Sequence, residues 1–372
     1  MEGQDRWYLI NGIEEIDSPG LVIYSDRVKK NIDLAISMIG DVNRLRPHVK
    51  THKSPDVTSL LLQKAVTKFK CATIAEAEML GTCHAPDVLL AYQPSGPKVQ
   101  RLIRLIKEYP DTKYSCLVDN LLSAQNLASH AKKNDIEIPV YIDLNVGMNR
   151  TGIEPGDKAF ILYQQIGDMK GIEPVGLHAY DGHISDQDFD QRKTKCEQAF
   201  ASVEKLKSDL KRSGVNDLVV VAGGSPTFPI HIDHKEVECS PGTFVYWDAS
   251  YHQSLSEQHF LPAALVISRV ISKPGDNLLC LDLGHKSIAA ENPLGKRVKF
   301  INSPELEFVG QSEEHLVVKY SDDHAFMIGD VLYGMPMHVC PTCALYESAI
   351  VIENHEVKGS WKTVARDRKI NI

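Results

Sequence analysis

Residues 44–54, RLRPHVKTHKS, decide how the rest of the chain is interpreted. If they form a strand, His48, Lys50 and His52 share one face, because side-chain direction reverses at every residue. Lysine is almost never fully buried without a partner, so a lysine in such a run has either a path to solvent or a chemical task. The ordinary alternative is an edge strand whose basic residues are solvated.

Seven further short runs rich in apolar and β-branched residues follow, and segments with a helical pattern separate them. The predicted strands cover residues 45–51, 68–73, 87–92, 113–118, 138–145, 173–180, 217–223 and 237–246. Strict alternation of strand and helix indicates a parallel sheet, and eight such units are the number that closes a barrel. An open doubly wound sheet has the same alternation, but no GxGxxG follows the first strand, so the fingerprint of dinucleotide binding is missing.

The pattern changes after about residue 255. Runs such as ALVISRVIS and NLLCLDLG are separated by Gly, Pro, Asn and Asp, without long helical patterns, which is typical of antiparallel strands. We therefore predict an α/β fold, with a (β/α)8 TIM-type barrel over residues 21–255 and a C-terminal antiparallel β domain over residues 256–372. Residues 1–20 are expected to join the β domain.

Composition excludes several classes of protein. The net charge is −8, and Lys and Arg are scattered, so the chain lacks the basic surface that nucleic-acid binding requires. The sequence has neither a signal-peptide pattern nor a run approaching the roughly 18 apolar residues of a membrane span, so a cytoplasmic enzyme is expected. The eight cysteines are too dispersed, in too long a chain, to form a disulfide framework.

The chemical task that suits an enclosed amine is covalent attachment to a carbonyl as a Schiff base, most familiarly with pyridoxal phosphate. Barrels of this kind collect their chemistry at the carboxyl ends of the strands, where Lys50, Arg150 and Tyr180 fall. A guanidinium such as that of Arg150 suits a cofactor phenolate, and a surface arginine is the alternative. Tyr180 suits a flat cofactor ring, and a core aromatic is the alternative.

A glycine pair follows the seventh predicted strand, where barrels often bind phosphate, in the segment Ala222-Gly-Gly-Ser-Pro-Thr227. Glycines at 223 and 224 let backbone N–H groups approach an anion, and the hydroxyl of Ser225 adds a donor. A plain turn uses the same residues.

A second cluster lies in the predicted β domain, in the segment Gly334-Met-Pro-Met-His338-Val-Cys340-Pro-Thr-Cys343. On an extended segment His338 and Cys340 point the same way, and an imidazole with a thiolate suits a divalent metal, zinc being the natural match. The alternative is that His338 and Cys340 lie close together for structural reasons or by chance and bind no metal. Cys340 and Cys343 also have redox-motif spacing, but they lack the βαβ context of that motif.

Three motifs together resemble the D-threonine aldolase and D-serine dehydratase family, pyridoxal-phosphate enzymes built like alanine racemase. They are Arg46-Pro-His-Val-Lys50-Thr-His52-Lys53, Asn145-Val-Gly-Met-Asn-Arg150-Thr-Gly152 and Pro336-Met-His338-Val-Cys340-Pro-Thr342. The resemblance implies that Lys50, rather than Lys53, is the Schiff-base lysine. It further implies a homodimer, Arg150 near the cofactor's phenolate, Tyr180 beside its ring, a phosphate site made by Gly224, Ser225 and Gly242, and a divalent metal (Zn, Mn or Mg) on His338 and Cys340.

The resemblance also bears on the reaction, because a metal beside the cofactor makes sense for a D-amino acid substrate with a β-hydroxyl group. An aldolase base takes the hydroxyl proton, and cleavage of Cα–Cβ gives glycine and an aldehyde. In a dehydratase, Lys50 takes the α-proton and hydroxide leaves, giving a keto acid and ammonia. Tyr180-Asp-Gly-His183 resembles the aldolase side, which implies that His183 is the base. D-threonine aldolase-type cleavage is therefore expected. The alternatives are a D-serine or 3-hydroxy-D-aspartate dehydratase and a non-catalytic pyridoxal-phosphate-binding protein.

Overall fold

The computed structural model describes residues 6–321 and 325–372, and its contacts divide the chain into two compact units. The barrel unit consists of Ala35–Lys50, Val57–Gly242 and Asp367–Ile372. The β unit consists of Met1–Leu34, Thr51–Asp56 and Thr243–Arg366. Its boundaries differ from the range 256–372 expected from sequence, because β1 (Gly20–Tyr24) hydrogen-bonds to strands of the C-terminal sheet. Among the described residues, no helix is both long and apolar enough to cross a membrane.

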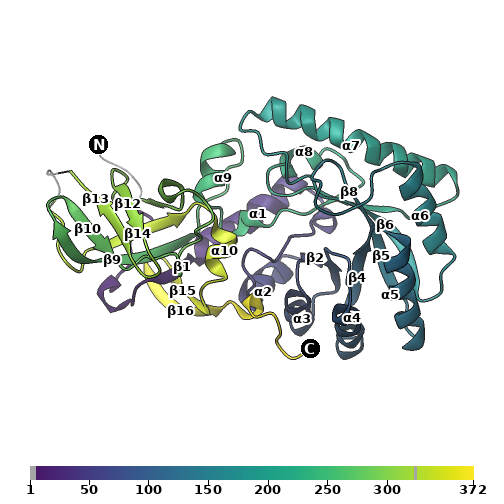
Figure 1. The fold of residues 1–372 in the computed structure, drawn as a ribbon, viewed down its shortest axis with the longest axis horizontal. Coiled ribbons are helices and arrows are strands. Elements are labelled where there is room, and N and C mark those ends of the chain that lie inside the picture. The colour runs from purple at the N-terminus through teal and green to yellow at the C-terminus, as the bar shows by residue number, and fades with distance from the viewer. Residues whose placement is uncertain (1–5, 322–324) are drawn as a thin grey trace. The chain divides into compact units, whose positions relative to one another are not determined.

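The described part of the barrel unit contains a seven-stranded parallel sheet in the order β2-β3-β4-β5-β6-β7-β8 (Figure 1). These strands are Lys68–Cys71, Asp87–Leu90, Lys113–Val118, Ile138–Leu144, Ile172–Ala179, Val219–Ala222 and Val237–Cys239. The segment before them makes single bridges to both edges, Leu45 to Cys239 of β8 and His48 to Lys70 of β2. The ring is therefore closed by this segment, and the predicted TIM-type barrel is confirmed.

The first predicted strand is shorter than expected. Its regular pairing ends at Val49, whose N–H donates to the carbonyl of Lys70, and the chain turns at Lys50. The imidazole of His48 accepts a hydrogen bond from the backbone N–H of Lys50 at 3.3 Å. Such local bonds between side chain and backbone compete with strand pairing. The predicted continuation of the strand to Thr51 is therefore wrong.

Helices α3 to α8 follow strands of this sheet, α2 follows the segment that closes it, and α1 follows β1 (Figure 1). Several begin at a side chain that accepts a hydrogen bond from the first turn, as Thr73, Asn120 and Asp188 do, which is the usual N-cap chemistry. Their bounds are α1 Ser25–Ile39, α2 Pro55–Gln63, α3 Ile74–Thr82, α4 Pro97–Glu108, α5 Leu121–Lys133, α6 Asp157–Gly167, α7 Phe189–Arg212 and α8 Phe228–His231.

The interior of the barrel unit has an ionic layer and an apolar layer. Arg46 is buried and pairs with Asp87 at 2.6 Å and with Glu238 at 2.7 Å. Such a pair is tolerated in the interior because both partners are hydrogen-bonded. The apolar layer is made by Leu89, Leu117, Tyr141 and Val221.

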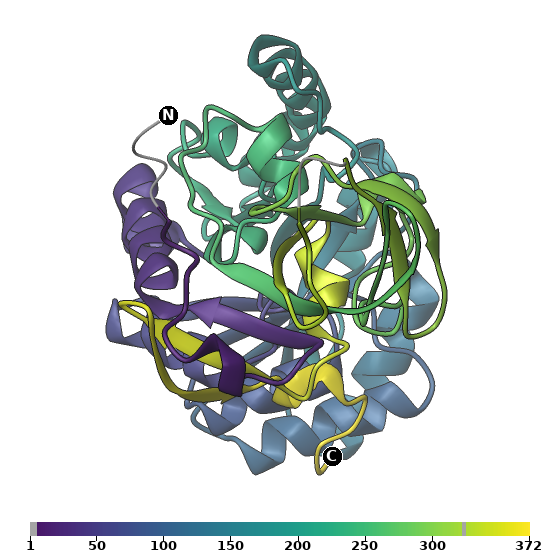
Figure 2. The same cartoon turned by 90° about the vertical axis from the view of Figure 1, so that its left-hand side faces the viewer.

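The β unit confirms the predicted C-terminal sheet of mainly antiparallel strands. Its strands run in the order β12-β13-β10-β9-β1-β15-β16, with β14 paired to β9 and β11. Among these pairs, β1 with β15 is parallel, and the two strands lie side by side in Figure 2. The bounds are β9 Ala264–Gly275, β10 Leu278–Leu281, β11 Val298–Phe300, β12 Glu307–Gln311, β13 Leu316–Lys319, β14 Val331–Pro336, β15 Ser348–Glu353 and β16 Glu356–Lys362.

The segment before β1 contributes to the core of the β unit. Ile10 and Ile16 are buried there with Val22 of β1, Leu265 of β9 and Ile352 of β15. Residues 1–5 of the predicted N-terminal segment lie outside the described residues.

Candidate functional site

The carboxyl ends of the barrel strands bring three of the predicted cofactor residues together. Tyr180 follows β6, and the guanidinium carbon of Arg150 lies 5.0 Å from the centroid of its ring. A Cβ atom added to Gly224 would lie 3.1 Å from a ring carbon of Tyr180, so the Gly224 backbone rests against that ring. This close approach explains why glycine suits the position.

The loops that follow β7 and β8 are joined by a hydrogen bond between predicted phosphate residues. The N–H of Gly242 donates to the hydroxyl of Ser225 at 3.3 Å, and the N–H of Gly224 donates to the hydroxyl of Thr227 at 3.2 Å. Gly223 has φ +77°, a value that side chains disfavour. The two loops therefore form one small polar cradle, defined by Gly223, Gly224, Ser225 and Gly242.

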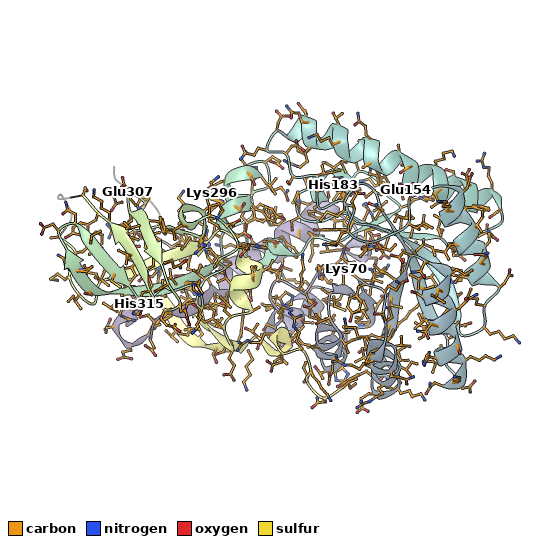
Figure 3. The ribbon with its side chains drawn as sticks, in the orientation of Figure 1. Lys70, Glu154, His183, Lys296, Glu307 and His315 are labelled. Atoms are coloured by element: carbon orange, nitrogen blue, oxygen red, sulfur yellow. The ribbon has the colours of Figure 1, made fainter. Side chains whose placement is uncertain are left out.

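His183 lies over the loop that follows β5. A Cβ atom added to Gly147 would lie 2.7 Å from its Nε2 atom, and Gly147 has φ +115°. The imidazole is exposed, and Gly147 belongs to the same loop as Arg150. The structure thus places His183 beside the arginine loop, with its ring accessible from solvent (Figure 3).

Asp143 and His178 form a buried pair on neighbouring strands β5 and β6. The Nδ1 atom of His178 lies 2.7 Å from a carboxylate oxygen of Asp143. Burial raises the pKa of Asp143, but the hydrogen bonds from His178 and Thr151, together with the charges of His178 and Lys70, outweigh burial, and the net pKa is lowered. Burial lowers the pKa of His178, so its ring is neutral, and its Nε2 atom has no partner among the described residues. This lone nitrogen is a buried polar atom that a bound molecule can satisfy.

Lys70 of β2 is a functional candidate that the sequence analysis missed. Its side chain is 2% exposed, and its Nζ atom lies 5.6 Å from the centroid of the Tyr180 ring (Figure 3). Burial and the charge of Lys50 lower the pKa of Lys70 to about 7. One feature of the sequence could have pointed to Lys70. It lies two residues after Lys68, so both lysines share one face of a predicted strand.

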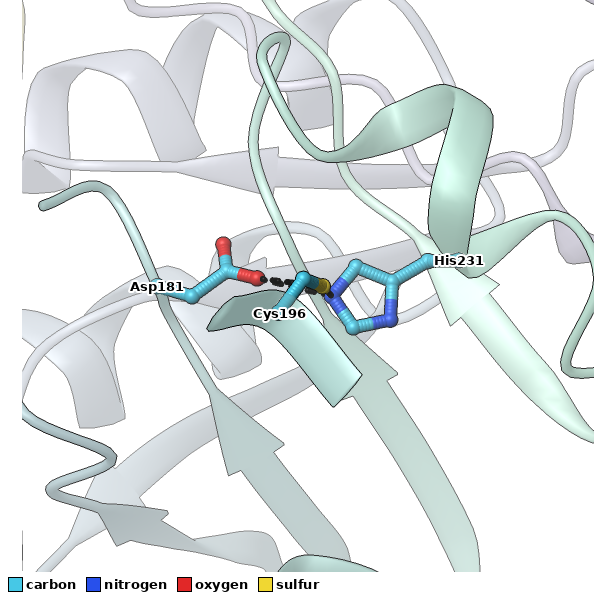
Figure 4. Close-up of side chains that lie close together, drawn as sticks. All are labelled: Asp181, Cys196 and His231. Atoms are coloured by element: carbon cyan, nitrogen blue, oxygen red, sulfur yellow. Dashed lines mark hydrogen bonds and ion pairs between the residues drawn. The ribbon is translucent and has the colours of Figure 1, made fainter. Parts of the chain in front are cut away.

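A second missed group is the buried cluster Asp181, Cys196 and His231 (Figure 4). One carboxylate oxygen of Asp181 accepts from the hydroxyl of Thr227 at 2.8 Å. The other lies 2.8 Å from Nε2 of His231 and 3.6 Å from Sγ of Cys196. The ligand atoms of the three residues lie within 4.8 Å of one another, so the group can hold a metal ion. No sequence motif predicts this cluster, because the three residues come from separate segments.

Hydrogen bonding alone accounts for the geometry of this cluster. Burial raises the pKa of Cys196, which disfavours the thiolate that a metal requires. Metal-binding histidines usually donate their second ring nitrogen to a partner, whereas Nδ1 of His231 has none among the described residues. Asp181 therefore serves as an anchor, and through Thr227 it holds the backbone of Gly224.

Replacing Asp181 with asparagine should lower the free energy of unfolding by about 1–3 kcal/mol, because buried donors lose a charged acceptor. Hydrogen bonds from His231 and Thr227 lower the pKa of Asp181, overcoming the effect of burial. The stabilisation is therefore present above the carboxyl's unfolded pKa and is lost as the pH falls, and the variant should lose this acid dependence. Urea unfolding at neutral and acid pH measures both effects.

Asp186→Asn is the matched control for this prediction, because Asp186 pairs with Lys195 on the surface. Exposed pairs contribute little, so this change should leave the unfolding free energy nearly unchanged. Equal losses in the two variants would contradict an anchoring role for Asp181.

The predicted metal residues lie in the β unit, and their local structure differs from the expectation. Cys340 belongs to the short helix α10 (Val339–Cys343), and His338 is its N-cap, so the expected extended segment is wrong. The helix forms because Val339 N–H finds an acceptor in Asp248 at 3.2 Å, and the hydroxyl of Thr342 donates to the carbonyl of His338. The imidazole and the thiol nevertheless meet, because a single turn also brings neighbouring residues together.

Several polar groups surround this pair. A hydrogen bond with Cys340 raises the pKa of His338 to about 9, and Nδ1 of His338 lies 2.5 Å from a carboxylate oxygen of Glu291. The hydroxyl of Thr51 lies 3.1 Å from Sγ of Cys340. Burial raises the pKa of Asp248 to about 6. Within the described residues, no third ligand atom completes a compact group with His338 and Cys340, so the arrangement is open rather than a closed structural site.

Two family models match successive parts of the chain. Residues 23–250 match the model described as "Alanine racemase, N-terminal domain". Residues 263–352 match the model described as "Putative serine dehydratase domain".

Three curated relatives are similar over most of their length. D-threonine aldolase of Arthrobacter sp is 26% identical over 361 residues, which cover 95% of this chain and 94% of the relative. The 3-hydroxy-D-aspartate aldolase of Paracoccus denitrificans (strain Pd 1222) is 25% identical, with coverage of 95% and 93%. The D-threo-3-hydroxyaspartate dehydratase of Delftia sp. (strain HT23) is 23% identical, with coverage of 89% and 93%.

Solved structures with similar folds come from the same group of enzymes. D-threonine aldolase from Filomicrobium marinum superposes with a TM-score of 0.89 at 24% identity, covering 96% of this chain and 98% of that one. D-threo-3-hydroxyaspartate dehydratase from Delftia sp. HT23 gives a TM-score of 0.78 at 21% identity, covering 94% and 98%. An alanine racemase of Clostridium difficile 630 gives 0.72 at 15% identity, covering 93% and 99%. At these identities the likeness shows the fold.

Proposed function

The chain belongs to the alanine racemase N-terminal domain family, whose model matches residues 23–250, and on that premise we propose that it is a pyridoxal-phosphate- and divalent-metal-dependent lyase. Its substrates are D-amino acids with a β-hydroxyl group, and its reaction is D-threonine aldolase-type cleavage to glycine and an aldehyde. The names of the relatives from Arthrobacter and Paracoccus support this reaction.

The residues of the barrel unit fit pyridoxal phosphate. The observation that carries the proposal is that Arg150, Tyr180 and Gly224 converge beside a cradle closed by the bond between Ser225 and Gly242. The cradle is lined by glycine backbone and the hydroxyl of Ser225, the elements from which phosphate sites are commonly built. The unpartnered Nε2 of His178 marks a buried place for a polar ligand.

In this proposal each residue has a definite part. Lys50 binds the cofactor covalently, Arg150 faces its phenolate, and Tyr180 borders its ring. Gly224, Ser225 and Gly242 hold its phosphate. When bound, pyridoxal phosphate withdraws electrons from the bonds at the α-carbon of an amino acid.

His183 is the proposed base that accepts the proton of the substrate hydroxyl. Its support is its place over Gly147, next to the arginine loop, and its exposure to incoming substrate. An imidazole accepts and returns protons near neutral pH, as such a role requires.

His338 and Cys340 are the proposed ligands of a divalent metal. The donor set fits, because an imidazole and a thiol that contact each other suit zinc, while the nearby carboxylate of Glu291 also suits manganese or magnesium. A bound ion supplies a Lewis acid for an alcohol oxygen. Open coordination positions match a catalytic rather than a structural ion.

A dehydratase is the second candidate, and the match of residues 263–352 to a serine dehydratase model favours it, as does the Delftia relative. In that reaction Lys50 takes the α-proton, and the products are a keto acid and ammonia. A non-catalytic cofactor-binding protein is the third candidate, and a β unit with an imidazole–thiol pair argues against it.

We also propose that the protein is cytoplasmic and forms a homodimer. Sedimentation of the purified protein tests the assembly.

Product analysis with D-threonine, D-serine and 3-hydroxy-D-aspartate separates the candidates. The loaded protein should release glycine and acetaldehyde from D-threonine when Zn²⁺, Mn²⁺ or Mg²⁺ is present, and L-threonine is the control. Keto acid and ammonia without glycine would replace the aldolase with the dehydratase. Cofactor binding with no product from any of the three would leave a non-catalytic protein.

A further inference from the structure

We propose that Lys70 is a second amine of the cofactor site and that its positive charge controls how readily the Lys50 nitrogen holds a proton. Lys70 is then a positioning residue that acts through Lys50. The inference rests on the proposed function, because it takes Lys50 as the cofactor lysine.

The backbone fixes Lys70 beside the segment that carries Lys50. The N–H of Lys70 donates to the carbonyl of Pro47, and the carbonyl of Lys70 accepts from the N–H of Val49, both at 2.9 Å. His48 and Lys70 are bridge partners in parallel register. Backbone hydrogen bonds therefore fix the register of Lys70 against the segment that ends in the turn at Lys50.

The side chain of Lys70 is enclosed without a counterion of its own. It makes no ion pair with any residue in 6–321 or 325–372, and its described polar neighbour is the ring face of Tyr180. Lysines are almost never buried in this way unless they have a partner or a function.

The charged groups facing Lys70 come from each neighbouring element. Burial is the largest effect and lowers the pKa of Lys70. Lys50 and Arg46 lower it further, and Asp181 and Asp143 raise it, with a result of about 7. His178 is neutral and adds no charge.

Both nearby carboxylates already have other partners. Asp143 pairs with His178 at 2.7 Å, and Asp181 binds His231 and Thr227 at 2.8 Å each. They therefore offset the charge of Lys70 only in part. A buried amine in this position loses its proton near neutral pH.

Two neighbouring amines repel each other when both are charged, so their protons are lost in coupled steps. Below about pH 7 the charge of Lys70 is present and opposes a proton on the Lys50 nitrogen. Above that pH Lys70 is neutral and no longer disfavours a proton on the Lys50 nitrogen. Lys70 thus links the protonation of the cofactor lysine to pH across the range in which the protein works.

The test is a pH titration of the visible absorbance of the cofactor-loaded protein. Lys70→Met removes the charge at similar volume, and the midpoint should rise by roughly one pH unit, since a neighbouring positive charge typically shifts a pKa by that amount or more. Lys70→Arg keeps the charge at every pH, and its midpoint should lie below that of the wild type. A second readout is the labelling rate of Lys50 by an amine reagent in the cofactor-free protein, followed by mass spectrometry, and it should fall in Lys70→Met.

Lys68→Met is the matched control, because Lys68 lies two residues earlier on the same strand and pairs with Glu238. It should leave the midpoint unchanged. Identical titrations of the wild type, Lys70→Met and Lys70→Arg would overturn the inference. If Lys70→Met does not fold, the comparison of Lys70→Arg with the wild type decides in the same way. Retention of the absorbance by Lys50→Ala would instead overturn the proposed function.

Discussion

Lys50→Ala is expected to abolish the visible absorbance of the bound cofactor and to reduce turnover by about 10³-fold or more, because the covalent anchor and a proton-transfer group are both lost. The fold should persist, since Lys50 lies in a turn and its side chain is only half-buried. An absorbance spectrum of the dialysed protein, together with product analysis, measures both effects.

Lys53→Ala is the matched control for this prediction. Lys53 is three residues away, and its Nζ atom donates to the carbonyl of Ala365 at 3.4 Å in the β unit. This variant should keep the absorbance. A wild-type protein that stays colourless after incubation with pyridoxal phosphate, or a coloured Lys50→Ala variant, would refute the assignment.

His338→Ala is expected to keep the cofactor absorbance while losing turnover by about 10²-fold or more, because the imidazole ligand of the metal is missing. Treatment of the wild type with a chelator should have the same effect, and added Zn²⁺ should restore the wild type but not the variant. Metal content by mass spectrometry and product formation are the two measurements.

Cys340→Ser and Cys343→Ala form a matched pair for the metal site. Cys340 contacts His338 and Thr51, whereas Cys343 is buried on the same short helix. Loss of metal should follow only the change at Cys340. Turnover that survives the chelator would show that the reaction needs no metal at these residues.

The barrel was predictable from sequence because buried parallel strands are short continuous apolar runs separated by helices. The positions of β2 to β7 follow from that pattern, whereas β8 ends at Cys239 instead of at the expected residue 246. The end of the strand predicted over 45–51 was wrong, because the imidazole of His48 accepts a hydrogen bond from the backbone and the chain turns there. The alternation of apolar and polar residues does not reveal such a bond. The same limit applies to His338 and Cys340, whose helix depends on Asp248, far away in sequence.

The site was only partly predictable, for a related reason. Glycines and charged residues at strand ends stand out in sequence, and Arg150, Tyr180 and Gly224 were found in this way. Lys70 was missed because Lys68 and Lys70, two residues apart, have the pattern of a solvated edge strand. Lys70 is buried only because the ring of strands closes. Asp181, Cys196 and His231 become neighbours only when α7 and α8 pack against the sheet.

The place of β1 has a consequence for how the chain is made. This strand is synthesised early, yet it lies between β9 and β15, whose pairing residues include Leu265 and Ile350. The edge of residues 20–24 that pairs with β15 must therefore stay open during synthesis until more than three hundred later residues have emerged. A nascent chain halted before β15 should consequently expose this strand to chaperones and proteases, whereas the released chain should not.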